Sequence, residues 1–370
     1  MTPAATITDP VAIEHFALPT FETTPAAQLR AIRDAVPGFK EWFRSTGTAS
    51  AYAPRSLITV PYPMKYGFYE ACTAPVPYVW FINRMFLVQW VDAGGDTRTL
   101  LYEPSDYDLG IETPFFRREY DKFARFSKAA ADRLSVEHKR VHEHLADFGL
   151  EPADIDYIAF DHMHTQDIRR IVGTTEPAPD LGFHSEPVPA AYPNARVVIA
   201  RDELTHVRDV HPFQQRFFQS GTYDHIREEQ LLFVERDVLL GPGVALLRTP
   251  GHTLGNFTLT VNTERGIFTS SENGIAAECY APEHSKLPGV AKWAKQWNYE
   301  VVMNFNTPEY ASLQYNSMVK EKLIADPVPG HEQFPQVLPT SEFTKYWMAP
   351  GIKPTYEHGE LTLGTVRRPS

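Results

Sequence analysis

The alternation of apolar and polar positions predicts a helical start, a β-rich stretch and a second helix in the first 150 residues. Apolar side chains at helical spacing predict a helix over 24–45 that is interrupted at Pro37 and Gly38. Short runs rich in Val, Ile, Tyr, Phe and Trp predict strands between 57 and 102. Helical spacing returns between 117 and 150, so a further helix is expected there.

The second half of the chain is again rich in strands. The run Ile155–Phe160 predicts a strand, and further strands are expected within Val244–Val261 and over Gly266–Thr269. Two β-rich halves with helices outside them indicate an α/β fold, an αββα sandwich. Between the halves, the loop Gly173–Pro193 contains five prolines. A long loop of this kind is expected to be functional, for example as a lid over a site.

Composition and charge limit the class of protein. A chain of 370 residues with 43% hydrophobic residues can bury a large core, in one domain or in one domain with appendages. The formal net charge is −11, and the basic pairs Arg117-Arg118 and Arg169-Arg170 are too short to form a basic stripe. Because an acidic chain repels phosphate backbones, we expect no nucleic-acid partner.

The cysteine content and the first residues bear on location. The two cysteines, Cys72 and Cys279, cannot build a disulfide framework and lack the spacing of a thiolate metal site. Residues 1–10 lack the basic and apolar segments of a secretory signal, and no window reaches the length of a membrane span. These observations predict a soluble, cytoplasmic protein without a membrane partner.

The segment after the strand 155–160 has the sequence Asp-His-Met-His-Thr-Gln-Asp and is the most informative in the chain. His162 and His164 are two residues apart at a strand end, so both rings leave the same face and can share one metal ion. Ligands at successive strand ends are typical of a site whose loops are aimed by a rigid sheet. Three later strand-to-turn junctions each deliver a nitrogen or carboxylate ligand: His252, Glu272 and His331.

This order of motifs resembles the metallo-β-lactamase superfamily over roughly residues 57–334. In that family His-x-His-x-Asp-His follows a strand, and a Pro-Gly-His turn, a carboxylate after a strand and a final Gly-His come next. Residues 192–198 also look like the short strand that the family places after its first helix. The resemblance implies an αββα fold and a metal centre with these candidate ligands: His162, His164, Asp167, His252, Glu272 and His331.

The departures from the family pattern fall on the second metal site. Gln166 and Asp167 stand where the family usually has Asp and His, and Glu272 stands where it has a bridging Asp. The first site, with three imidazoles, suits Zn²⁺. A second site of Asp167, Glu272 and His331 would be richer in oxygen, which favours Mn²⁺ or iron. We therefore predict one or two Zn²⁺ ions, with Mn²⁺ or iron as alternatives at the second site.

Several candidates also have an ordinary structural explanation. Asp167 precedes a helix-like run and suits its N-cap, a role compatible with metal binding. Glu272 can be a solvated turn residue, and His331 can be an ordinary loop histidine. Gln166 is a poor ligand for a dication, so we expect it to hydrogen-bond next to the site. The role of His184, in the proline-rich loop, stays open.

Aromatic residues gather in 279–306 and in the tail that follows. We expect them to form a hydrophobic seam or a homodimer contact in preference to a substrate pocket, because aromatic side chains usually serve packing. If they line the site, the substrate is apolar or aromatic. The chain is predicted to divide into an N-terminal, partly helical extension (1–56), a metallo-β-lactamase-like domain (57–338) and a C-terminal tail that packs on the domain or on a partner (339–370).

The predicted function is that of a metal-dependent hydrolase acting on a small, apolar or aromatic substrate. A metal held by histidines lowers the pKa of its water towards about 7, and this metal-bound hydroxide attacks an ester, lactone, amide, thioester or activated carbon. Asp167 or Glu272 is expected to orient the water or to return a proton to the leaving group. The alternatives are a di-iron redox enzyme acting on oxygen or nitric oxide, and a non-catalytic metal-binding protein.

Overall fold

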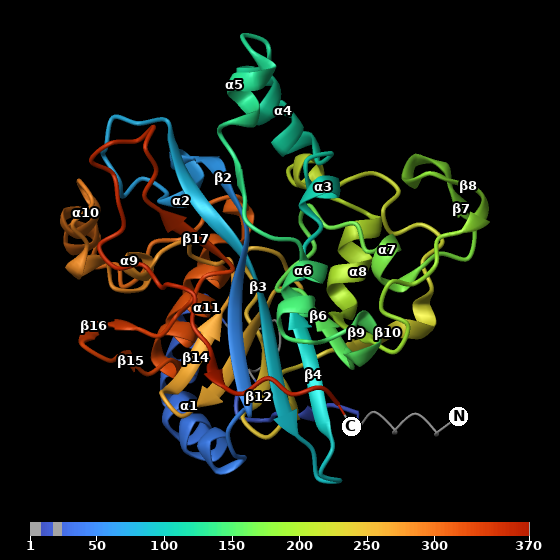
Figure 1. The fold of residues 1–370 in the computed structure, drawn as a ribbon. Coiled ribbons are helices and arrows are strands. Elements are labelled where there is room, and N and C mark those ends of the chain that lie inside the picture. The colour runs from blue at the N-terminus through green and yellow to red at the C-terminus, as the bar shows by residue number, and fades with distance from the viewer. Residues whose placement is uncertain (1–8, 18–23, 370) are drawn as a thin grey trace.

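The computed structural model describes residues 9–17 and 24–369 and shows two β-sheets packed face to face with helices outside them (Figure 1). The predicted αββα sandwich is confirmed. The antiparallel sheet consists, in spatial order, of β1 (Val11–Ala12), β11 (Val238–Gly241), β12 (Val244–Arg248), β13 (Phe257–Thr263) and β14 (Gly266–Ser270). The mixed sheet consists of β10 (Leu231–Val234), β9 (Arg196–Ala200), β6 (Tyr157–Ala159), β4 (Thr97–Tyr102), β3 (Tyr78–Val91), β2 (Ala51–Pro63) and β18 (Leu363–Gly364), with β17 (Ser341–Thr344) beside β3 and β5 (Val136–Glu137) beside β2.

Helices and two small hairpins surround the sheets. The α-helices are α1 (Pro25–Ser45), α2 (Met64–Gly67), α3 (Tyr107–Gly110), α4 (Pro114–Ala124), α5 (Lys128–Asp132), α6 (Val141–Asp147), α7 (Arg169–Val172), α8 (Arg201–Arg208), α9 (Ala277–Tyr280), α10 (Val290–Trp297) and α11 (Ala311–Ile324). Single 3₁₀ turns are η1 (Pro152–Asp154), η2 (Pro179–Leu181), η3 (Gln215–Phe217), η4 (Glu228–Gln230), η5 (Pro282–His284) and η6 (Pro308–Tyr310). The hairpins are β7 (Pro177–Ala178) with β8 (Phe183–Pro187), and β15 (Pro327–Val328) with β16 (His331–Pro335).

The inner strands β12 and β13 of the antiparallel sheet are buried on both faces. Along β12, Val244 and Leu246 point into the core between the sheets, whereas Ala245 and Leu247 point outward against α1. This alternation follows from the two-residue period of a strand. Because α1 covers the outer face, β12 is apolar at four consecutive positions, and this run made the strand predictable from the sequence.

Helix α1 runs without a break through Pro37, contrary to the predicted interruption. Pro37 and Gly38 lie on its exposed face, whereas Phe39 and Phe43 are fully buried against the antiparallel sheet. A proline inside a helix costs about 3 kcal/mol, and burying two phenylalanine side chains contributes about 3–6 kcal/mol. Packing on the sheet therefore outweighs the local preference of the sequence.

The single helix predicted over 117–150 is wrong. The structure has the short helices α4, α5 and α6 there, and the strand β5 lies between α5 and α6. β5 pairs with β2, so that Glu137 lies opposite Ile58. This tertiary pairing separates the helices, and α4 and α5 project above the sandwich at the top of Figure 1.

Both ends of the described chain are joined to the sheets. β1 pairs with β11, while β17 and β18 in the C-terminal tail pair with β3 and β2. Residues 1–8 and 18–23 of the predicted N-terminal extension lie outside the described residues, and the division into three segments stays a prediction. Across the described residues, no helix combines the length and the apolar character that crossing a membrane requires.

Candidate metal centre

Three imidazoles converge between the loop after β6 and the turn after β12. One ring nitrogen from each of His162, His164 and His252 lies within 4.8 Å of the others, and all three side chains are buried. His164 Nδ1 and His252 Nε2 are 3.2 Å apart. Two nitrogen ligands of a tetrahedral Zn²⁺ ion are separated by about 3.3 Å, given Zn–N bonds of about 2.0–2.1 Å. The predicted triad thus has the spacing of a single-ion site.

Sharp backbone turns present these histidines. Thr165, directly after His164, has φ +64, a left-handed conformation that a β-branched residue rarely adopts. Its amide donates to the carbonyl of Phe217 at 2.8 Å, which helps to hold the turn. Gly251 precedes His252, and a Cβ atom there would lie 2.2 Å from Cα of Gln314. Only glycine therefore fits the Pro-Gly-His turn.

Asp161 orients the first histidine. Its carboxylate hydrogen-bonds to Nδ1 of His162 and also accepts the hydroxyl of Thr340 at 2.7 Å. A carboxylate on Nδ1 fixes the ring and leaves Nε2 for an ion, as is common around metal-bound histidines. Burial opposes a charge on His162, but Asp161 raises the pKa of His162 to about 9. Burial, together with the neighbouring His162, lowers the pKa of His164 and of His252 well below the usual value, so both are neutral at pH 7, the form that binds metals.

A single carboxylate from α8 forms hydrogen bonds to both histidine segments, the one after β6 and the one after β12. Glu203 is almost fully buried and accepts the amide of Met163, between the first two histidines, at 2.9 Å. Its other oxygen accepts the hydroxyl of Thr253 at 2.7 Å and the amide of Gly255 at 3.0 Å. Because these contacts span both segments, Glu203 fixes the distance between the ligands of the triad.

Glu272 lies beside this triad. Its carboxylate forms a second group of potential ligands with Asp161 and His162, and it accepts the hydroxyl of Ser341 at 3.2 Å. Burial raises the pKa of Glu272 to about 7, and the neighbouring His162 partly offsets this effect. A carboxyl group with this pKa can exchange a proton near neutrality.

Asp167 does not lie where a second metal site would need it. Both of its oxygens face the Arg169 guanidinium, at 2.7 Å from Nη2 and 3.0 Å from Nε, and Oδ1 also accepts the Arg169 amide at 3.0 Å. The amide contact is at the start of α7, close to the N-cap role considered for this residue. Asp167 belongs to no group of potential metal ligands among the described residues. Its ion pair with Arg169 explains this placement.

His331 is also away from the triad. It is exposed on the β15–β16 hairpin, where its ring centroid lies 4.9 Å from that of Tyr356. The chain returns to the sheet only at Val337, which bridges to Thr269 of β14. The residues that then reach the site are Thr340 and Ser341, which hydrogen-bond to Asp161 and Glu272. The excursion into a hairpin therefore removes the predicted fourth histidine from the centre.

Replacing Asp167 by asparagine is expected to leave the metal content unchanged and to lower the free energy of unfolding by about 1–3 kcal/mol, because the buried Arg169 loses the buried one of its two carboxylate partners. Elemental analysis and urea denaturation measure the two quantities. Asp180→Asn is the control, since Asp180 pairs with the same arginine but is 61% exposed. Loss of metal in Asp167→Asn would restore the predicted ligand role.

The two residues left open in the sequence lie in different places. Gln166 lines a pocket above the histidines and donates to Oγ of Ser105 at 2.9 Å, a hydrogen-bonding role as expected. His184 is exposed on β8. The proline-rich loop 173–193 contributes no residue to the pocket lining among the described residues, so it does not act as a lid in this structure.

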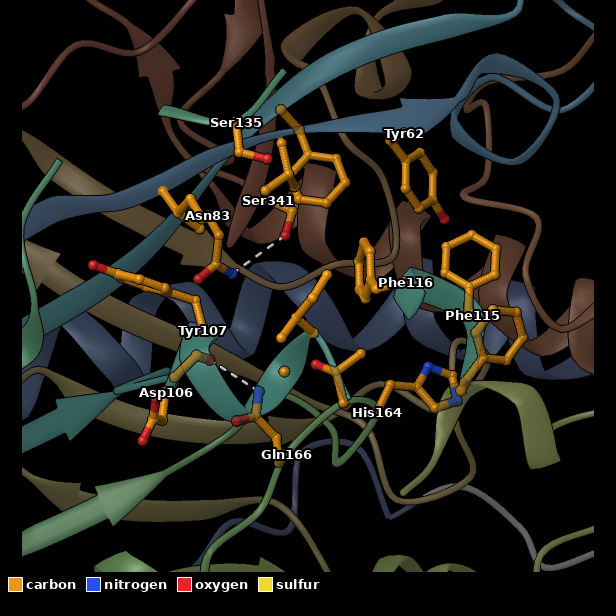
Figure 2. A pocket seen from close by; sticks show the side chains of 18 of the residues that line it. Tyr62, Asn83, Asp106, Tyr107, Phe115, Phe116, Ser135, His164, Gln166 and Ser341 are labelled. Atoms are coloured by element: carbon orange, nitrogen blue, oxygen red, sulfur yellow. Dashed lines mark hydrogen bonds between the residues drawn. The ribbon is translucent and has the colours of Figure 1, made fainter. Parts of the chain in front are cut away.

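The pocket opens directly onto the triad and has a volume of about 380 Å³. Figure 2 shows Tyr62, Phe115 and Phe116 gathered on one side of it and Tyr107 on the other, with His164 at its base. These aromatic residues come from β2 and from the segment around α3 and α4. The C-terminal aromatics singled out in the sequence do not line the pocket; Trp297 and Trp347 are 56% and 71% exposed.

Comparison with known proteins identifies the fold. A scan of protein-family models and a sequence search of curated proteins give no match. Among solved structures, a probable metal-dependent hydrolase from Staphylococcus aureus superposes with a TM-score of 0.50 at 14% identity, over 84% of this chain and 96% of that one. The chain has the metallo-β-lactamase fold.

Two further solved structures are similar to this chain with TM-scores under 0.5. An N-acyl homoserine lactone hydrolase with N-hexanoyl-L-homoserine at its catalytic metal centre is 16% identical, with a TM-score of 0.47 over 80% of this chain and 94% of that one. The hydrolase AbOPH of the β-lactamase superfamily is 14% identical, with a TM-score of 0.41 over 73% and 84%. At such identities the likeness concerns the fold and leaves the substrate to be argued from the site.

Proposed function

We propose that this protein is a metal-dependent hydrolase of a small, largely apolar substrate. The observation that carries the proposal is the convergence of three buried imidazoles, two of them neutral at pH 7, at the base of an aromatic pocket. Such donors suit Zn²⁺, and a structural zinc site would be closed by a fourth protein ligand, whereas these three face a pocket. Zinc at the triad is therefore the ion that we propose.

An ion at the triad would supply an acidified water and would polarise a carbonyl group. The residues around it have separate tasks. Asp161 hydrogen-bonds to Nδ1 of His162 and leaves its Nε2 for the ion. Glu203 fixes the distance between the segment with His162 and His164 and the segment with His252. Glu272, whose carboxyl group has a pKa of about 7, is placed to take a proton from the attacking water and to return it to the leaving group.

The pocket supports a substrate with an apolar or aromatic part. Its walls carry Tyr62, Phe81, Phe115, Phe116 and Phe217, which exclude water from the reacting group. A carbonyl compound such as an ester or lactone fits this arrangement, because one end can bind the walls while the carbonyl reaches the triad. Amides, thioesters and activated carbon centres use the same chemistry and belong in the same test.

The di-iron alternative is less well supported by the geometry. It needs a second set of ligands, and Asp167 and His331, which were expected to provide two of them, lie elsewhere. The remaining carboxylates, Asp161 and Glu272, share His162 with the first group. A non-catalytic metal-binding protein would have the same triad, so only an activity assay distinguishes it from a hydrolase.

Metal analysis combined with a substrate panel tests this proposal. We expect about one zinc per chain and hydrolysis of an uncharged aryl ester or lactone, because the triad holds one ion. Chelation should abolish hydrolysis, and added Zn²⁺ should restore it. Iron with visible absorbance would favour the redox alternative, and bound zinc without hydrolysis across the panel would favour the non-catalytic one.

A further inference from the structure

The lining of the pocket is rich in carboxyl groups. Among the described residues of the lining there is no lysine or arginine. The lining contains six carboxylates, from both the base and the mouth of the pocket: Glu103, Asp106, Asp108, Asp132, Glu137 and Glu272. An anionic substrate would therefore meet no compensating cation on these walls, apart from the metal centre itself.

Four of these carboxylates are engaged with other groups. Asp106 pairs with Arg170 at 3.0 Å, and Asp108 pairs with Arg140. At the base, Glu103 hydrogen-bonds to the amide of Asp161, and Glu272 faces His162. These four carboxyl groups therefore already have partners in the fold or at the metal centre.

The two remaining carboxylates line the pocket at exposed positions and form no ion pair with any residue that the structure describes. Asp132, at the end of α5, accepts the hydroxyl of Tyr120 at 2.6 Å and no other hydrogen bond from the residues in 9–17 and 24–369. Glu137, on β5, has no side-chain partner among the described residues. The nearby Arg140 is held by both oxygens of Asp108 and does not line the pocket. The mouth thus carries two carboxylates that form no ion pair in the described part of the chain. The Arg140 guanidinium lies 5.2 Å from the centroid of the Tyr107 ring and interacts electrostatically with Glu137, which leaves Asp132, Phe116 and Tyr120 more open to a ligand.

Aromatic rings line the pocket together with these charges. Tyr107, Phe116 and Tyr120 belong to the lining around α3 and α4, and Figure 2 places Tyr107 and Phe116 across the cavity from one another. The face of an aromatic ring attracts ammonium groups, and such contacts are strongest with organic cations that are weakly hydrated. Rings and carboxylates in one pocket therefore favour the same kind of ligand.

An independent feature indicates that the pocket receives a ligand. Asn306 is only 6% exposed and lines the pocket. Its Oδ1 accepts the hydroxyl of Tyr62 at 2.7 Å, but its Nδ2 donates to no residue that the structure describes. Nδ2 is not among the fully buried side-chain atoms that lack a partner, so water reaches it, and a ligand in the pocket can accept its hydrogen bond in place of that water.

We propose that the pocket selects substrates that carry an organic cation, an amine or a quaternary ammonium group, joined by an apolar arm to the group that is hydrolysed. Asp132 and Glu137 bind the cation at the mouth, and the aromatic walls bind the arm. This proposal rests on the pocket being the substrate pocket of the hydrolase proposed above. Its test uses binding alone, so it can fail or succeed independently of hydrolysis.

The test compares three ligands of similar shape and different charge on the full-length protein by calorimetry. The probes are benzyltrimethylammonium, its uncharged carbon isostere neopentylbenzene, and benzylsulfonate. We expect the cation to bind about tenfold more tightly than the uncharged isostere, since an exposed charge pair and a cation–π contact together contribute about one order of magnitude. The anion should bind more weakly than both, and the advantage of the cation should shrink at high salt.

The double variant Asp132→Asn with Glu137→Gln should remove most of the difference between the cation and its isostere. Both side chains are exposed, so the fold should persist, and circular dichroism checks this. Glu264→Gln is the matched control, because Glu264 is an exposed carboxylate outside the pocket lining. Equal affinity for the three probes, tighter binding of the sulfonate, or an unchanged difference in the double variant would each overturn the proposal.

Discussion

His164→Ala is expected to abolish metal binding at micromolar protein concentrations and to lower kcat/KM for ester hydrolysis by at least about 10³-fold. His164 contacts both other members of the triad, since its Nδ1 lies 3.2 Å from Nε2 of His252 and its ring centroid lies 4.7 Å from that of His162. Two imidazoles would remain, and two imidazole ligands hold a divalent ion too weakly for it to survive purification. Elemental analysis and steady-state kinetics measure the two effects.

His331→Ala is the matched control for this experiment. The sequence motif places His331 among the ligands, whereas the structure places it on an exposed hairpin. We therefore expect the metal content and kcat/KM of His331→Ala to stay within about twofold of the parent protein, as for other exposed positions. The opposite pattern, metal lost in His331→Ala and kept in His164→Ala, would refute the placement of the centre.

Glu203→Gln is expected to weaken metal binding by about 10–100-fold, the range typical of groups that support metal ligands. The amide nitrogen of glutamine cannot accept a hydrogen bond, so either the Met163 amide or the Thr253 and Gly255 pair loses its acceptor. The two histidine segments would then be free to separate. Competition with a chromogenic chelator measures the affinity, and thermal unfolding of the metal-free protein shows how much of the effect is structural.

The adjacent Asp202 supplies the control for Glu203. It lies on the same helix but its side chain is 65% exposed, and within the described part of the chain its one ion pair is with Arg248. Asp202→Asn should therefore change neither metal affinity nor the unfolding temperature measurably. If Glu203→Gln destabilised the metal-free protein but bound zinc with unchanged affinity, Glu203 would serve the fold alone.

The first metal site could be predicted from the sequence because its ligands lie at the ends of strongly apolar strands. β6 and β12 are buried on both faces, so their ends could be located, and His162, His164 and His252 follow at short distances along the chain. Asp161 stands directly before His162 and could have been recognised by the same motif. Its contact with Nδ1 of His162, however, depends on side-chain geometry that spacing alone does not give.

The fate of the second site and the lining of the pocket could not be predicted from the sequence in this way. Asp167 forms an ion pair with Arg169, two residues away, and the β15–β16 hairpin carries His331 out of the sheet. Neither event leaves a periodic signal in the sequence. Glu203 comes from α8, far from the motifs along the chain, and no local pattern predicts that it hydrogen-bonds to two separate loops.

The sequence by itself determined the layers of this protein and the triad, because both follow from local periodicity and from motifs at strand ends. Tertiary structure decided which side chains surround the triad. Pairing of β5 with β2 broke a predicted helix and placed Glu137 at the mouth of the pocket, and packing of Phe39 and Phe43 carried α1 through Pro37. These outcomes depend on contacts between segments far apart in the chain, whose free energies exceed the local preferences that a sequence displays.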